Sequence, residues 1–130
     1  MEGFGEVAFR VQSSAAVRCA LLAETARQQA QGLMNRTDLS GYDGMLFVFS
    51  SDTTSDFYMK DTPLPLSIAW FDSNGRLVST TDMEPCLGGG SCPLYGAAGP
   101  YRYALEVPKG RLPSLGITPG AVITVGGPCT

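Results

Sequence analysis

The sequence of 130 residues contains no histidine. This absence excludes Ser-His-Asp triads, Cys-His nucleophile pairs and zinc sites with imidazole ligands. Charged residues are also few, at 16% of the chain, and they give a net charge of −3. Binding to nucleic acid requires a basic surface, so we expect no nucleic-acid partner.

Long apolar segments are absent as well. The longest uncharged run, residues 112–130, contains three prolines and four glycines, which would interrupt a membrane-spanning helix. We therefore predict no transmembrane segment. The first residues also lack the basic and apolar regions of a signal peptide. The protein is then either cytosolic or begins after a signal peptide has been removed.

Four cysteines are present, and they allow three pairings. We favour Cys86–Cys92, across a glycine-rich loop, and Cys19–Cys129, which joins an early strand to the C-terminus. The loop-entropy model assigns these bonds about 2 and about 5 kcal/mol. The alternatives are four free thiols or a zinc site, although the spacing does not suit zinc. Two disulfides would indicate an extracytoplasmic protein, which is periplasmic, on the cell surface or secreted.

The apolar pattern predicts a chain of short strands. One short helix should begin at Thr25, which has capping-box spacing to Gln28, and continue to Leu33. Asn74-Gly75 indicates a hairpin turn. The predicted strands are residues 6–11, 17–22, 45–49, 57–60, 66–71, 76–83, 101–107 and 121–125.

About eight short strands with one short helix predict a mainly β fold, a compact β-barrel or β-sandwich. The length suits a single domain over residues 1–130. We expect residues 1–5 to be a flexible or added extension. A parallel α/β fold is disfavoured because helices do not alternate with the strands.

Several ordered motifs resemble one known family. They are Gln31-Gly32-Leu33-Met34, the apolar run 44–49, the segment 57–66, the Pro-Cys…Cys-Pro-Leu-Tyr loop at 85–95, and Tyr-Ala-Leu-Glu-Val-Pro-Lys-Gly at 103–110. Together they are similar to "domain of unknown function 192" over roughly residues 17–125. The resemblance implies a compact β-rich domain of bacteria and archaea, often exported, with no established activity.

The chain departs from the family pattern at five positions. Gln31 stands in place of arginine and Ser67 in place of aspartate, and the other departures are Asn35, Asp61 and Ala121. If the family's aspartate belongs to a polar site, Ser67 indicates that this site is lost or has a different specificity.

Residues 57–62 contain the side chains best suited to binding a ligand. In an extended strand, Tyr58 and Lys60 face one side and Met59 faces the other. A lysine beside a phenol and a carboxylate suits an anionic or polyhydroxylated ligand. The simpler alternative is that Lys60 pairs with a nearby acid while Met59 packs in the core. The candidate ligand-binding residues, with the nearby tyrosines, are Tyr58, Met59, Lys60, Asp61, Thr62, Tyr95, Tyr101 and Tyr103.

Carboxylates offer a catalytic alternative. Asp82 and Glu84 lie two residues apart, about 7 Å along one strand face, and such a pair occurs in inverting glycosidases. Glu106 is a third candidate. Ordinary surface charge is the simpler interpretation of the pair. We expect no metal and no cofactor, because the internal methionines suit core packing better than copper binding.

We therefore favour a non-catalytic binding or accessory module for a polar small molecule, a glycan or a partner protein. One alternative is a hydrolase of cell-envelope material, which should have carboxylates that converge in a pocket and a strongly shifted pKa. The other is a purely structural or assembly domain, which should have an exposed apolar patch and no cavity. On balance the sequence argues against an enzyme.

Overall fold

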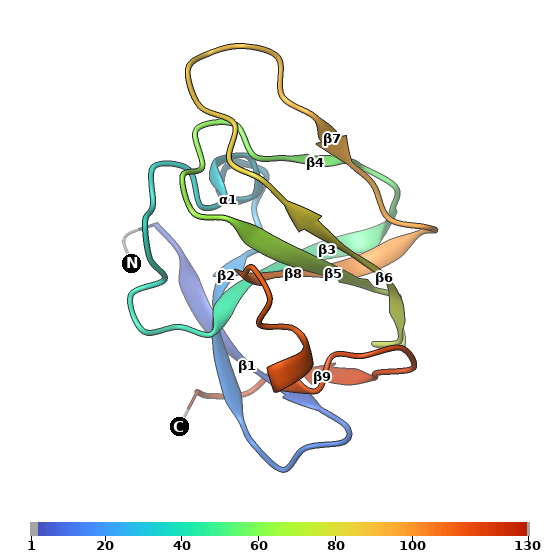
Figure 1. The fold of residues 1–130 in the computed structure, drawn as a ribbon. Coiled ribbons are helices and arrows are strands. Elements are labelled where there is room, and N and C mark those ends of the chain that lie inside the picture. The colour runs from blue at the N-terminus through green and yellow to red at the C-terminus, as the bar shows by residue number, and fades with distance from the viewer. Residues whose placement is uncertain (1–2, 130) are drawn as a thin grey trace.

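Strands dominate the computed structural model, which describes residues 3–129 (Figure 1). In chain order its elements are β1 (Gly5–Val11), β2 (Arg18–Ala23), α1 (Ala26–Gln31), β3 (Gly44–Thr53), β4 (Phe57–Tyr58), β5 (Leu66–Phe71), β6 (Leu77–Met83), β7 (Leu94–Tyr95), β8 (Tyr101–Pro108), the 3₁₀ turn η1 (Pro113–Leu115) and β9 (Ile123–Val125). The prediction of a mainly β fold with one short helix is confirmed.

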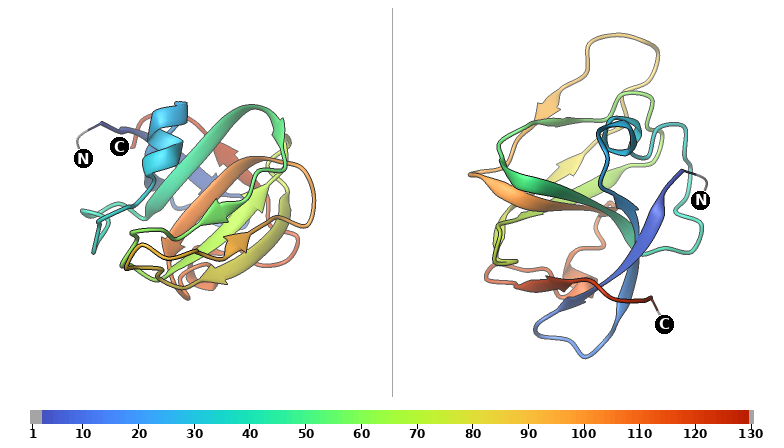
Figure 2. Two further views of the ribbon diagram at one scale, coloured as in Figure 1. Left: turned by 90° about the horizontal axis from the view of Figure 1, so that it is seen from above. Right: turned by 180° about the vertical axis from the view of Figure 1, so that it is seen from behind.

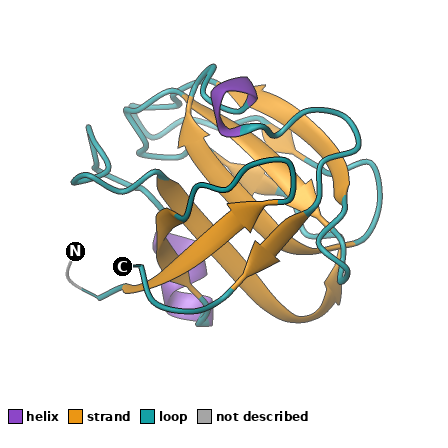
Figure 3. Ribbon diagram, turned by 90° about the horizontal axis from the view of Figure 1, so that it is seen from below, coloured by secondary structure: helices purple, strands orange, loops and turns teal. Residues whose placement is uncertain are grey.

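Seven of the strands form one sheet in the order β6-β5-β8-β3-β2-β1-β9, while β4 pairs with β7 in a small second sheet. The pairs are antiparallel except for β2 and β3, which run parallel with Leu22 opposite Leu46. The large sheet is strongly curled, as the two further views show (Figure 2). The helix α1 and the turn η1 lie at opposite ends of it (Figure 1, Figure 3).

The curling brings the two edges of the large sheet into contact. The amide of Leu77 donates to the carbonyl of Ala121 at 2.9 Å, and the amide of Ile123 donates to that of Gly75 at 2.8 Å. The turn between β5 and β6 therefore touches the strand at the opposite edge, and the sheet has the form of a partly closed barrel.

Apolar side chains cover both faces of this sheet. On β3, Met45 and Phe47 belong to one buried cluster, and Leu46 between them belongs to another. The first cluster also contains Trp70 and Tyr101, and it lies beneath α1 and β4. The continuous apolar run in β3 follows from this arrangement, because a strand covered on both sides needs no polar face.

The helix α1 begins as its sequence predicts. The side chain of Thr25 accepts from the amide of Gln28 at 3.2 Å, and the side chain of Gln28 accepts from the amide of Thr25 at 3.1 Å. None of its six residues is buried. Instead, the side-chain amide of Gln29 donates to the backbone carbonyls of Val48 at 2.8 Å and Ala23 at 3.3 Å, and so joins the helix to β3 and β2.

Both expected disulfides are present, Cys19–Cys129 and Cys86–Cys92. No helix in residues 3–129 is long and apolar enough to cross a membrane. Of the predicted N-terminal extension, residues 1–2 lie outside the described part. Among the described residues of this extension, the carbonyl of Gly3 accepts a hydrogen bond from the side chain of Gln28 at 2.7 Å, and Phe4 packs against the first core cluster.

Candidate functional site

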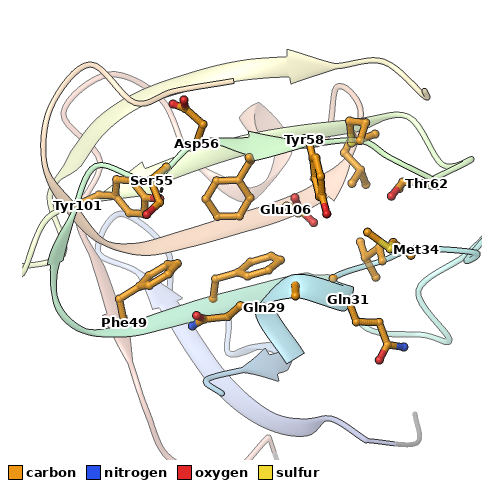
Figure 4. A pocket seen from close by; sticks show the side chains of 17 residues that line it. Gln29, Gln31, Met34, Phe49, Ser55, Asp56, Tyr58, Thr62, Tyr101 and Glu106 are labelled. Atoms are coloured by element: carbon orange, nitrogen blue, oxygen red, sulfur yellow. Dashed lines mark hydrogen bonds between the residues drawn. The ribbon is translucent and has the colours of Figure 1, made fainter. Parts of the chain in front are cut away.

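A cavity of about 280 Å³ opens between α1 on one side and β4 with the segment after it on the other (Figure 4). Strands β3 and β8 form its inner wall. Its apolar lining consists of Ala30, Leu33, Met34, Phe47, Phe49, Phe57, Met59 and Leu66. The remaining lining residues are Gln29, Gln31, Gly32, Ser55, Asp56, Tyr58, Thr62, Tyr101 and Glu106.

Aromatic rings make up much of the wall. Phe47 and Phe49 lie two residues apart on β3, so both project from the same face of the strand. Phe57 meets Phe47 edge-to-face with ring centroids 5.0 Å apart, and Tyr101 meets Phe49 in the same way at 5.5 Å. These contacts hold the rings in fixed positions around the cavity.

Glu106 supplies the carboxyl group of the inner wall. It lies on β8 between β3 and β5, opposite Met45 and Ile68, and it is only 4% exposed. Alternation along β8 places its side chain on the same face as that of Ala104, which belongs to the cluster beneath α1. Gly44 allows the close approach of β3 here, because a Cβ atom would collide with the backbone carbonyl of Glu106.

Burial alone raises the pKa of the Glu106 carboxyl from 4.5 to about 8. No hydrogen bond or nearby charge within residues 3–129 contributes to this shift. The carboxyl is therefore mostly protonated at neutral pH, and no group of residues 3–129 forms a side-chain hydrogen bond with it. A buried polar group of this kind is unusual and often marks a functional position.

Two hydroxyl groups in the cavity already have partners. The Thr62 hydroxyl donates to the carbonyl of Lys60 at 3.1 Å, and the Tyr101 hydroxyl donates to the carbonyl of Ser55 at 2.6 Å. Burial, with a smaller contribution from Asp56, raises the pKa of Tyr101 to about 12. Tyr101 therefore stays protonated and holds the loop between β3 and β4 in place.

Four of the eight predicted ligand residues line the cavity: Tyr58, Met59, Thr62 and Tyr101. The other four, Lys60, Asp61, Tyr95 and Tyr103, do not. The strand predicted over residues 57–60 ends at Tyr58, so its alternation stops before Lys60. The Lys60 side chain is exposed, and its backbone forms an isolated β-bridge with that of Cys86. At Asp61 the chain turns, with a φ of 54°.

Of the three candidate catalytic carboxylates, only Glu106 reaches the cavity. Asp82 is exposed and accepts from the Ser67 hydroxyl at 2.6 Å. Glu84 forms an exposed ion pair with Lys109 at 2.9 Å. Ser67, which stands where the family has aspartate, also accepts from the amide of Gly110 at 3.0 Å.

Sequence reasoning did not select the phenylalanines of β3 and β4 or the residues of α1 that line the cavity. One signal was available for Glu106. It is a charged residue between two apolar neighbours, Leu105 and Val107, in the strand predicted over residues 101–107. A charged side chain at such a position is either exposed on one face or buried for a reason, and the chain alone does not distinguish the two.

Comparison with known proteins places this fold among uncharacterised domains. A chain from Sinorhizobium meliloti 1021, provisionally named a transcription regulator, is similar at a TM-score of 0.83 and 26% identity, covering 96% of this chain and 97% of that one. A protein of unknown function from Novosphingobium aromaticivorans DSM 12444 is similar at 0.77 and 30% identity, covering 93% and 84%. The search of curated proteins found no match. The family model DUF192, described as "Uncharacterized ACR", matches residues 8–125, and the chain therefore belongs to this family.

Proposed function

We propose that this domain is a non-catalytic binding module that holds a small molecule in the cavity between α1 and β4. The observation that carries the proposal is the Glu106 carboxyl, buried at 4% exposure and without a hydrogen-bond partner in the described chain. A ligand group that hydrogen-bonds to this carboxyl would be oriented by it within the cavity.

The cavity has the features of a small-molecule site. Such sites measure roughly 300–1,000 Å³, with mainly apolar walls and a few polar groups that orient the ligand. The cavity, at about 280 Å³, is at the small end of that range and has one deeply buried carboxyl. This lining supports a ligand with an apolar body and one polar group, in preference to a glycan, which carries many hydroxyls.

The module acts outside the cytoplasm in this proposal. Its support is the pair of disulfides, because such bonds persist in oxidising compartments and are rare in the cytosol. Non-reducing mass spectrometry of the protein isolated from its native cells tests this. Two intact disulfides are expected, and four free thiols would contradict export.

Ligand-detected NMR with a library of small amines, acids, alcohols and amides tests the binding proposal. We expect compounds whose binding is lost in Tyr58→Ala, which removes an aromatic ring from the wall. The matched control is Leu87→Ala. Leu87 is also an exposed apolar residue, at 59% against 43% for Tyr58, but it does not line the cavity. Equal binding by both variants, or no binding by the unmodified protein, would reject the cavity as the site.

A hydrolase is the second candidate, favoured by the raised pKa of Glu106, which suits a general acid. Asp56 also lines the cavity, but its side chain points away from it (Figure 4). Hydrolysis predicts turnover of envelope-derived glycosides or esters that Glu106→Gln abolishes. A cavity ligand recovered unchanged after prolonged incubation would support the binding module instead.

A further inference from the structure

We infer that the ligand of this cavity is a protonated amine on an apolar body, with its ammonium group against the Glu106 carboxylate. The inference rests on the proposed small-molecule binding and names the ligand class for that site. It is carried by the charges, the aromatic rings and the unpartnered carboxyl of the cavity.

The charge of the lining is one-sided. Its titratable side chains are Asp56, Tyr58, Tyr101 and Glu106, and no lysine or arginine from residues 3–129 joins them. The helix α1 contributes only the neutral amides of Gln29 and Gln31 as polar side chains, and β3 contributes only phenylalanines. A carboxylate ligand would meet the acidic Glu106 side chain and no cation. An ammonium group would instead meet a side chain of opposite charge, and its N–H groups would donate hydrogen bonds to the Glu106 carboxylate.

The aromatic wall favours the same ligand. Five rings line the cavity, from Phe47, Phe49, Phe57, Tyr58 and Tyr101. The face of an aromatic ring carries negative potential and attracts an ammonium group, most strongly where water is excluded. The same rings contact the apolar body of the ligand. A neutral ligand gains only the second of these contributions.

The arrangement of the groups gives the ligand a direction. The Glu106 carboxyl lies at the back of the cavity between the Tyr58 ring and β3, while Met34 and Thr62 lie at one end (Figure 4). With about 30 Å³ for each water-sized unit, the cavity of about 280 Å³ holds a ligand of roughly nine non-hydrogen atoms. An amine on a single aromatic ring has this size.

Binding of an ammonium should expel a proton from Glu106. The pKa of the Glu106 carboxyl is about 8 in the protein alone. Near neutral pH this carboxyl must therefore ionise before it pairs with the cation. Affinity for the amine should therefore rise between about pH 6 and about pH 8, by up to tenfold per unit. Tyr101 does not titrate in this range, because its pKa is about 12. Asp56 and Tyr58 are exposed at the rim.

Titration calorimetry with three probes of one shape tests the inference: phenethylamine, phenethyl alcohol and phenylacetate. At about pH 8 we expect the amine to bind at least tenfold more tightly than the alcohol, and phenylacetate to bind most weakly. Glu106→Gln should reduce amine affinity to that of the alcohol and leave alcohol affinity within about threefold. The matched control Glu84→Gln carries the same substitution outside the cavity and should bind as the unmodified protein does.

Each other result is decisive. If the alcohol or phenylacetate binds as tightly as the amine, the inference is wrong while small-molecule binding stands. If none of the three probes binds and the NMR library yields cavity ligands that are not amines, the inference again fails alone. If the library also yields none, the proposed function fails with it. Should Glu106→Gln not fold, the proton released by the unmodified protein, measured in buffers of different ionisation enthalpy, decides the question. Absence of proton release at about pH 7 would overturn the inference.

Discussion

At the scale of single residues, Glu106 links the stability of the fold to pH. Its pKa is about 8 in the folded protein against 4.5 ordinarily, so between these values the folded state holds a proton that the unfolded chain has lost. Its contribution to stability is therefore fully present below about pH 4.5 and falls as pH rises towards 8, by up to about 1.4 kcal/mol per unit.

Glu106→Gln should remove this dependence, because an amide does not titrate. We expect the free energy of unfolding of the variant to change less between about pH 5 and pH 8 than that of the unmodified protein. Urea unfolding across this range measures the slopes. Parallel slopes for the two proteins would mean that Glu106 titrates alike in the folded and unfolded states.

Gly75 is a second residue whose identity the fold requires. It has a φ of 79°, and a Cβ atom there would collide with the carbonyl oxygen of Ile123 at the opposite sheet edge. We expect Gly75→Ala to lower the free energy of unfolding by about 3 kcal/mol, from backbone strain and collision together. In the control Gly88→Ala the φ is 92° but the surroundings are open, so only the strain, about 1 kcal/mol, should remain. Equal losses in urea unfolding would show that the sheet edges are not in tight contact.

At the scale of elements, the helix α1 is joined to β2 and β3 through hydrogen bonds of one side chain. It buries no residue, and Gln29 alone donates side-chain hydrogen bonds from it to β2 and β3. We expect Gln29→Ala to cost about 1–2 kcal/mol and to speed amide exchange in residues 26–31. Arg27→Ala, an exposed change on the same helix, should leave exchange unaltered. If exchange is unaltered in Gln29→Ala too, other contacts hold the helix.

The elements also show what local pattern can and cannot predict. Residues 66–71 form a strand with the predicted bounds, and Thr25 caps the helix, because an apolar run and capping-box spacing can both be recognised from neighbouring residues. The strand β7 was not predicted, since Leu94-Tyr95 is too short for a period. It exists because it pairs with β4, which is distant in sequence.

The cavity was predictable only in part for the same reason. Four of the eight predicted ligand residues line it, and three of them, Tyr58, Met59 and Thr62, come from the one segment around Met59. Its other wall is α1, and its carboxyl comes from β8, so the chain must fold before these segments meet. The preference for Lys60 assumed a strand that continues to residue 60, whereas β4 ends at Tyr58.

At the scale of the whole molecule, the two disulfides should contribute unequally to stability. Cys19–Cys129 spans 110 residues and Cys86–Cys92 spans 6. The loop-entropy model predicts losses of about 5 kcal/mol for the double serine variant of the first and about 2 kcal/mol for that of the second. Urea unfolding of both variants measures the difference. Equal losses of stability would mean that local contacts around each disulfide, and not the length of the loop it closes, determine its contribution.

The span of Cys19–Cys129 also determines how the domain responds to mechanical tension. Force applied to the two ends of the chain passes from Cys19 directly to Cys129, so the residues between them carry no load. Only β1 and its flanking residues can be peeled away, a gain of roughly 60 Å at about 3.4 Å per residue. The cavity, whose lining residues all lie between the two cysteines, is thereby shielded from direct load for as long as the bond remains oxidised.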